Sequence, residues 1–279
     1  MAKEFKSFFK TVGGNEGTLC HYPTRLDLYG CGCAHDCGYC YARALLDFRG
    51  LWNPTDPARA DIEKVRRKIK KLHAGEVVRL GGMTDCFQPI EREAGLTYEA
   101  IKALNAQGVG YLIVTKSALV ADEKYLAIYD KRLAHFQISI TSTNNATAAT
   151  YEKASAVSDR IKAAEKLEAL GFDVCLRLSP FIPEFIDIDI VNAVKVHKIL
   201  VEFLRANTFI KKTFPIDYTP YIHKSGNYNH LPLDAKLALL DRIKGHEVTV
   251  CDDVPEHYWH FKDNFNPNSC DCCNLRRSI

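Results

Sequence analysis

The segment Leu28-Tyr-Gly-Cys-Gly-Cys-Ala-His-Asp-Cys-Gly-Tyr-Cys-Tyr-Ala-Arg43 contains Cys33, Cys37 and Cys40 at the spacing C-x3-C-x2-C. It lies between a short β-rich run and a segment of helical pattern. Three thiolates on one short loop can ligate three irons of a 4Fe-4S cubane and leave the fourth iron without a protein ligand. Such an open coordination position is typical of catalytic metals. The spacing therefore predicts a catalytic 4Fe-4S cluster on this loop.

A structural zinc site is the alternative interpretation of the same cysteines. Such sites usually combine two separated pairs of ligands, which is not the spacing of this loop. His35 lies between the first two cysteines, and the sequence does not fix its direction. The cluster is the favoured interpretation, and a non-catalytic metal-binding module stays as the alternative.

Outside the cysteine loop, short β-rich runs alternate with helical patterns. The runs cover residues 26–29, 77–80, 111–114, 136–140 and 174–178, and the helical patterns cover 62–72, 97–104, 158–170 and 187–206. Thr97 and Ser158 are the expected N-caps of two helices, and Gly171 is an expected helix stop. This alternation indicates βαβ units, the α/β class and a parallel sheet whose strand C-termini carry the active-site loops.

The chain is expected to divide into three segments. Residues 1–23 form an N-terminal extension, residues 24–214 form the α/β core, and residues 215–279 form a closing C-terminal subdomain. The last boundary is placed where repeated prolines loosen the alternating pattern.

The composition excludes several classes of protein. The chain has 279 residues, of which 47% are hydrophobic and 25% charged, which excludes disordered and fibrous proteins. No apolar run reaches the roughly 18 residues of a membrane helix, and the N-terminal residues lack the apolar stretch of a signal peptide. A cytoplasmic protein without a membrane partner is therefore expected. The net charge of +3 neither requires nor excludes nucleic acid, and eleven cysteines favour metal or redox chemistry.

The cysteine loop and the segment Gly81-Gly-Met-Thr-Asp-Cys-Phe-Gln-Pro-Ile-Glu91 together resemble the radical S-adenosylmethionine (SAM) superfamily, and within it the spore photoproduct lyase-like branch. The resemblance covers residues 24–180. It implies a partial (β/α)6 barrel of the TIM type with a small cysteine-containing C-terminal subdomain. It also implies a 4Fe-4S cluster and SAM as cofactors, an external electron donor, and a 5'-deoxyadenosyl radical that abstracts hydrogen from a substrate.

Several residues match positions that bind SAM in the superfamily. Gly81 and Gly82 lack a Cβ, which allows the backbone to approach the methionine moiety closely. Lys116 matches a lysine near the cofactor carboxylate. The implied cofactor-binding residues are Tyr39, Gly81, Gly82, Thr84, Asp85, Lys116, Ser142 and Arg177. The structural alternatives are a tight turn for the glycine pair and a solvated side chain for the lysine.

Two tyrosines, Tyr39 and Tyr41, flank the last cysteine of the loop. The resemblance implies that Tyr39 stacks near the adenine and that the pair relays a hydrogen atom, with core packing as the alternative. Lyases of this branch carry a hydrogen-donating cysteine shortly before a Ser-Asp or Thr-Asp pair, and this chain has residues 81–83, Gly-Gly-Met, there. Cys86, which follows Asp85, is the candidate substitute donor. Tyr41 and Cys86 are therefore the candidate catalytic residues.

A second group of cysteines lies near the end of the chain. Its members are Cys251, Cys270, Cys272 and Cys273. Four thiols are enough for an auxiliary iron-sulfur cluster or a structural zinc site. Adjacent cysteines are awkward ligands for one metal, so free or redox-sensitive thiols are the favoured interpretation.

The resemblance implies a thymine-derived base in DNA as the substrate, either modified or isomerised as in hypermodified viral DNA, or repaired in a lyase reaction. The missing donor cysteine favours modification or isomerisation, in which the hydrogen returns from 5'-deoxyadenosine. Aromatic and basic side chains near the C-terminal end, such as Tyr218, Trp259 and Lys224, can stack a base and hold phosphate, although any closing lid carries such a mixture. The alternatives are a small-molecule or peptide substrate and a non-catalytic binding module.

Overall fold

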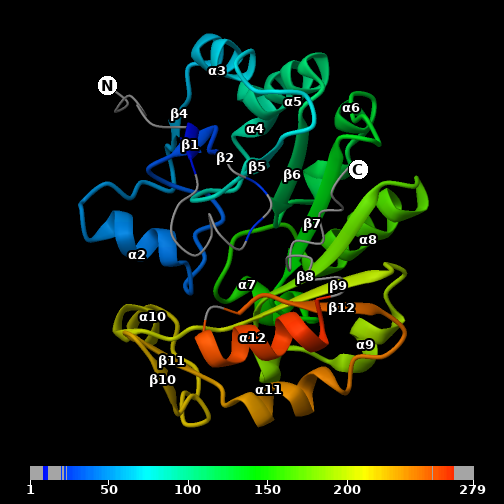
Figure 1. Cartoon of the computed structure of the whole chain (residues 1–279). Helices are drawn as coiled ribbons and strands as arrows, with labels where there is room; N and C mark the ends of the chain where they lie inside the picture. Colours follow the sequence, from blue (N-terminus) through cyan, green and yellow to red (C-terminus); the bar gives the residue numbers. More distant parts are fainter. Residues whose placement is uncertain (1–8, 12–19, 21, 23, 253, 267–279) are drawn as a thin grey trace.

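The computed structural model describes residues 9–11, 20, 22, 24–252 and 254–266. Its centre is an eight-stranded sheet, shown in Figure 1. In spatial order the strands are β1 (Phe9–Thr11), β2 (Thr24–Leu26), β5 (Val77–Leu80), β6 (Gly110–Thr115), β7 (Ala134–Ile140), β8 (Asp173–Phe181), β9 (Lys198–Phe203) and β12 (Glu247–Val250). β1 runs antiparallel to β2, and every other neighbouring pair is parallel. The expected α/β class with a parallel sheet is confirmed.

Helices connect the parallel strands and cover one face of the sheet. They are α3 (Ile62–Ile69), α4 (Glu91–Ala94), α5 (Leu96–Gln107), α6 (Glu123–Leu126), α7 (Asn145–Ala149), α8 (Val157–Ala169) and α9 (Ile188–Ala193), with 3-10 turns at Ala118–Ala121 and Pro183–Phe185. α8 packs on β7 and β8, and α5 packs on β6 and α3. Within the described ranges, no helix is long and apolar enough to cross a bilayer.

The remaining elements lie outside the central sheet. They are β3 (Tyr29–Gly30), β4 (Ala58–Arg59), α2 (Tyr41–Asp47), α10 (Thr208–Thr213), β10 (His223–Ser225), β11 (Tyr228–His230), α11 (Leu233–Leu240) and α12 (Pro255–Asn264). β3 pairs with β4, and β10 forms an antiparallel pair with β11. α10 contacts α2, so a late segment of the chain closes on the helix that follows the cysteine loop (Figure 1).

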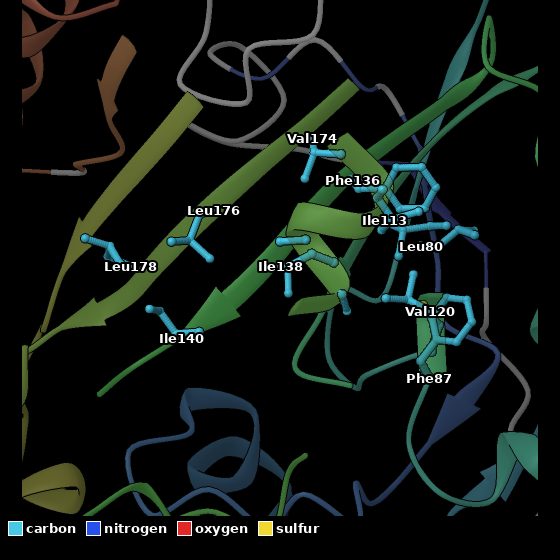
Figure 2. Close-up of a cluster of buried hydrophobic side chains, with 14 of the residues drawn as sticks. Leu80, Phe87, Ile113, Val120, Phe136, Ile138, Ile140, Val174, Leu176 and Leu178 are labelled. Atoms are coloured by element: carbon cyan, nitrogen blue, oxygen red, sulfur yellow. The ribbon is translucent and has the colours of Figure 1, made fainter. Parts of the chain in front are cut away.

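The core lies between the sheet and its helices, as Figure 2 shows. Alternate residues of β7, namely Phe136, Ile138 and Ile140, point into this core and are at most 1% exposed. The residues between them point to the opposite, inner face, because side chains alternate along a strand. On that face Gln137 accepts a hydrogen bond from Arg177 of the neighbouring strand at 2.7 Å. The sheet therefore has an apolar helix-covered face and a polar inner face.

Replacing Ile138 by alanine tests this core. The side chain is fully buried among other strand residues, so its removal leaves a cavity and is expected to lower the free energy of unfolding by about 2–5 kcal/mol. Urea unfolding under anaerobic conditions measures the change. Ile190→Ala is the matched control, because Ile190 is 43% exposed and its truncation should cost less than about 1 kcal/mol. Equal losses in the two variants would contradict the assignment of the core.

The expected helix caps are only partly correct. Gly171 follows the end of α8 with a φ of 81°, as a helix stop requires. Ser158, however, lies inside α8, and its N–H donates to Asn145 Oδ1 at 3.0 Å. Thr97 also lies inside its helix, and its N–H donates to Glu91 Oε2 at 2.9 Å. In both cases a side chain from the preceding helix accepts the free N–H, which a search for local caps misses.

The expected long helix over residues 187–206 is wrong. The structure has the short helix α9, then a break, then strand β9. β9 has the sequence Lys-Ile-Leu-Val-Glu-Phe and lies between β8 and β12. A strand that is buried on both faces of a sheet has a continuous apolar sequence. Periodicity alone does not distinguish such a strand from a buried helix.

The main sheet draws strands from all three expected segments. β1 belongs to residues 1–23 and pairs with β2, while β12 belongs to residues 215–279 and pairs with β9. The described part of the C-terminal segment therefore contributes to the central sheet as well as to the elements around its edge. A functional division at residue 214 stays a prediction.

Candidate functional site

The three candidate cluster ligands lie on the loop between β3 and α2. Cys33 and Cys37 are buried, and Cys40 is half-buried and directly precedes α2 as its N-cap residue. Two tight turns separate the thiols: Asp36 N donates to Cys33 O at 3.0 Å, and Cys40 N donates to Cys37 O at 3.2 Å. The loop therefore presents three thiols from successive turns.

Burial governs the protonation of the Cys33 and Cys37 thiols. It raises the pKa of Cys33 to about 12 and the pKa of Cys37 well above its ordinary value. Lys116 lowers the pKa of Cys37 and so partly offsets burial, because a nearby cation favours the thiolate. Metal ligation needs thiolates, so binding of a metal at this loop releases protons.

Segments distant in sequence fix the cysteine loop. Gly38 N donates to Tyr151 O at 2.8 Å, and Thr213 Oγ1 donates to Gly38 O at 2.7 Å. A Cβ on Gly38 would lie 3.0 Å from Thr213 O, which is a tight contact, so glycine favours this close approach. On the other side of the loop, Ala34 N donates to Gln88 Oε1 at 2.9 Å. The loop is thus held by the segments that follow β5, β7 and β9.

The loop after β5 is organised by Asp27, a residue that the sequence analysis missed. Its Oδ1 accepts from the N–H groups of Gly82, Met83 and Thr84 at 2.8, 2.8 and 3.3 Å. Gly81 has a φ of 81°, which a glycine adopts without strain. The sequence gives no separate signal for Asp27, because residues 26–29 read as one β-rich run, whereas the structure ends β2 at Leu26. The role of the glycine pair in binding SAM stays a prediction.

Asp85 joins three parts of the site. Its Oδ1 accepts from Thr115 Oγ1 at 2.7 Å and from Phe87 N at 2.8 Å, and its Oδ2 accepts from Lys116 N at 2.7 Å. Oδ2 also lies 3.2 Å from His35 Nε2 in the cysteine loop. Burial raises the pKa of Asp85, but His35 and the hydrogen bonds outweigh it, so the pKa is lowered. The carboxylate therefore ties the cysteine loop to the end of β6.

Thr84 is likewise engaged within the chain. It is buried, and its hydroxyl donates to Tyr29 O at 2.6 Å. A direct role for Thr84 or Asp85 in holding SAM stays a prediction, because both side chains already have partners within the protein.

Lys116 lies beside Tyr39, a residue of the cysteine loop. Lys116 Nζ is 5.6 Å from the centroid of the Tyr39 ring. Tyr39 is buried, and its ring packs edge-on against Tyr151 and Phe214. The Tyr39 hydroxyl donates to Glu152. The core-packing interpretation thus accounts for much of the Tyr39 ring, and its expected place near an adenine stays a prediction.

Tyr41 reaches the loop after β5. It is 41% exposed, and its hydroxyl donates to Gly82 O at 2.5 Å. The guanidinium groups of Arg25 and Arg79 lie close enough to interact electrostatically with this phenol. Tyr41 therefore joins the two loops that the sequence analysis singled out.

Three further candidate residues are buried or have bonding partners within the protein. Ser142 is fully buried, and its hydroxyl bonds to the backbone of Phe185 at 3.0 Å. Arg177 lies on the inner face of the sheet, paired with Glu202. Cys86 is 1% exposed and belongs to the hydrophobic core. A role of Cys86 as hydrogen donor stays a prediction.

The candidates of the C-terminal segment are the four cysteines of the second group and the aromatic residues expected to stack a base. Cys270, Cys272 and Cys273 lie outside the described residues, while Cys251 is half-buried and donates its N–H to Val201 O at 2.8 Å. Trp259 is 56% exposed on α12, with Lys262 Nζ 4.7 Å from the centroid of its ring. A second metal at the terminal cysteines stays a hypothesis.

Comparisons with known proteins identify the family. The family model described as "Radical SAM superfamily" matches residues 28–196, which is more than half of the chain. The chain belongs to this superfamily. A curated relative, the uncharacterized protein MJ0683 of Methanocaldococcus jannaschii, is 26% identical over 165 residues, which are 57% of this chain and 61% of that protein. The chain thus spans about three-fifths of the length of that relative.

Solved structures of spore photoproduct lyase share the fold. A double mutant with bound AdoMet (SAM) and dinucleoside spore photoproduct has a TM-score of 0.59 at 16% identity, covering 88% of this chain and 80% of that one. The complex of spore photoproduct lyase with dinucleoside spore photoproduct gives the same TM-score and coverage at 15% identity. This likeness confirms the expected partial barrel of the radical SAM type.

Radical SAM proteins use a 4Fe-4S cluster and SAM, and the cysteine loop fits the cluster. Within the described part of the chain, no three His, Cys, Asp or Glu side chains converge where one ion could bind. A single zinc needs such convergence. A cubane instead takes one thiolate at each of three irons, which suits thiols from successive turns. Cys33, Cys37 and Cys40 would therefore hold the cluster.

Proposed function

We propose that this protein is a radical SAM enzyme that acts on a thymine-derived base in DNA. The observation that carries the proposal is the contact of Tyr41 with Gly82, which joins the cysteine loop to the loop where lyases of the branch carry their donor cysteine. The likeness of the fold to a lyase crystallised with a dinucleoside photoproduct supports the same class of substrate. An external one-electron donor is part of the proposal.

The residues of the chain have distinct tasks in this proposal. Cys33, Cys37 and Cys40 hold the cluster, and Lys116 provides a cation beside it. When bound, the two cofactors supply a 5'-deoxyadenosyl radical, which removes a hydrogen atom from a substrate carbon. Tyr41 is the side chain placed to relay a hydrogen atom, because its hydroxyl lies at the junction of the two loops.

Isomerisation or modification is favoured over lyase repair. None of residues 81–83 is a cysteine, and the Cys86 side chain is 1% exposed within the hydrophobic core. In an isomerisation, the rearranged substrate takes a hydrogen atom from the Tyr41 hydroxyl, and the tyrosyl radical takes one from 5'-deoxyadenosine, so no protein thiol is needed. SAM is then regenerated, and one molecule supports many turnovers.

The proposal is tested with reconstituted, dithionite-reduced protein under anaerobic conditions. SAM is added with and without thymine-containing DNA, and 5'-deoxyadenosine and altered nucleosides are measured by mass spectrometry. We expect DNA to stimulate SAM cleavage and an altered nucleoside to exceed the SAM consumed. Cleavage without any effect of DNA would favour a small-molecule or peptide substrate. An intact cluster without cleavage would leave a metal-binding module.

Tyr41→Phe tests the relay. Loss of the hydroxyl should lower formation of the altered nucleoside at least about tenfold, equivalent to about 1.4 kcal/mol of activation free energy, while SAM cleavage continues. Tyr98→Phe is the control, because Tyr98 lies on α5 and its ring contacts Tyr125. Equal product yields from both variants would exclude the relay.

A further inference from the structure

A buried ion pair lies beside the cysteine loop. Glu152 is 4% exposed and Arg160 is fully buried in the first turn of α8. Arg160 donates to Glu152 Oε1 through Nη2 and to Ser139 O through Nη1, the latter at 2.9 Å. Because removing two charges from water costs about as much as their attraction returns, stability alone does not explain this pair.

The second oxygen of Glu152 points to the cysteine loop. Oε2 accepts from the Tyr39 hydroxyl and from Thr141 Oγ1, the latter at 3.2 Å. The same oxygen lies 4.0 Å from Cys37 Sγ. A buried carboxylate therefore contacts both a candidate cluster ligand and the tyrosine that precedes the last cysteine.

The partners of this carboxylate compensate its buried charge. Arg160 donates to Oε1, and the hydroxyls of Tyr39 and Thr141 donate to Oε2. The side chain is thus a fixed negative charge in a region that water does not reach. Charges interact more strongly in such a region than at the surface.

We propose that Glu152, held in place by Arg160, is a positioning residue that sets the reduction potential of the cluster through its charge beside Cys37. The potential of an iron-sulfur cluster depends on net charge, on hydrogen bonds to sulfur and on burial. Reduction adds one electron from an external one-electron donor and forms or breaks no bond. A carboxylate next to the cluster repels that electron, so it lowers the potential.

The test is a potentiometric titration of the reconstituted full-length protein, followed by the electron paramagnetic resonance signal of the reduced cluster. We expect Glu152→Gln to increase the ratio of reduced to oxidised cluster at a fixed potential about tenfold, a shift of about 59 mV to more positive values. Arg160→Met should shift the potential in the opposite direction. The double variant, which removes both charges, should lie close to the wild type.

Two controls accompany the titration. Glu123→Gln removes one charge from the exposed pair of Glu123 with Lys166 and should leave the potential unchanged. Iron content per chain shows whether each variant holds a complete cluster. The titration contains neither SAM nor DNA, so its result is independent of the proposed substrate.

A purely structural role of Glu152 predicts a different pattern. An unchanged potential in Glu152→Gln, or equal shifts in Glu152→Gln and Arg160→Met, would overturn the proposal. Either single variant leaves a buried charge unpaired and can fail to fold. Glu152→Asp then serves instead, because it keeps the charge and withdraws it from Cys37. We expect a smaller positive shift in that variant, and no shift would likewise overturn the proposal.

Discussion

Cys37→Ala is expected to abolish both the iron-sulfur absorbance and the cleavage of SAM. A cluster held by three thiolates loses one of its irons or fails to assemble when one ligand is removed. The measurement is iron content and 5'-deoxyadenosine after anaerobic reconstitution. Cys33→Ala and Cys40→Ala should give the same result, because each thiol on this loop ligates a different iron.

The matched control is Cys175→Ala. Cys175 is buried in β8, and its removal should leave iron content and SAM cleavage unchanged. Full SAM cleavage in any of the three loop variants would contradict the assignment of the ligands. About eight irons per wild-type chain, in place of about four, would show a second cluster and direct attention to the terminal cysteines.

Asp85→Ala is expected to destabilise the protein and to prevent loading of the cluster. The change leaves the N–H groups of Phe87 and Lys116 and the hydroxyl of Thr115 without an acceptor. Each buried donor without a partner costs about 1–3 kcal/mol, so the free energy of unfolding should fall by at least about 3 kcal/mol. Thermal unfolding and iron content measure the two effects.

Asp217→Ala is the control for this change. Asp217 is exposed and accepts from Thr219 N at 2.9 Å, so its removal should cost less than about 1 kcal/mol. A stable Asp85→Ala variant with a full cluster would show that the carboxylate does not hold the cysteine loop.

The stability that Asp85 contributes should depend on pH. Its pKa is lower in the folded protein than in the unfolded chain. The contribution is therefore complete above the unfolded value, near about 4, and is lost as the pH falls through the folded value. Asp85→Asn should remove this part of the acid dependence, which unfolding of both proteins between pH 3 and pH 6 measures.

The sequence was most informative where the feature is local. The C-x3-C-x2-C spacing predicts one loop because all three thiols lie within eight consecutive residues. Strands β5, β6, β7 and β8 were also predictable, because each is a short apolar run that is followed by a turn. The helix stop at Gly171 follows from the conformation that glycine adopts.

Features that depend on contacts between residues distant in sequence were not predicted. Residues 198–203 form a strand because β8 and β12 lie on either side, which their apolar sequence does not reveal. The caps of α5 and α8 come from Glu91 and Asn145 on preceding helices. Cys86 is close to Asp85 in sequence, but the turn between them directs its thiol into the core.

The sequence by itself determined the α/β class, the cysteine loop and the superfamily, because these depend on short spacings and on the period of apolar residues. Only the tertiary structure decided which charges surround that loop. Asp85 and Glu152 reach it from two separate segments, through contacts between residues up to 115 positions apart. Such contacts exist only once the strands are aligned and their carboxyl ends meet at one edge of the sheet.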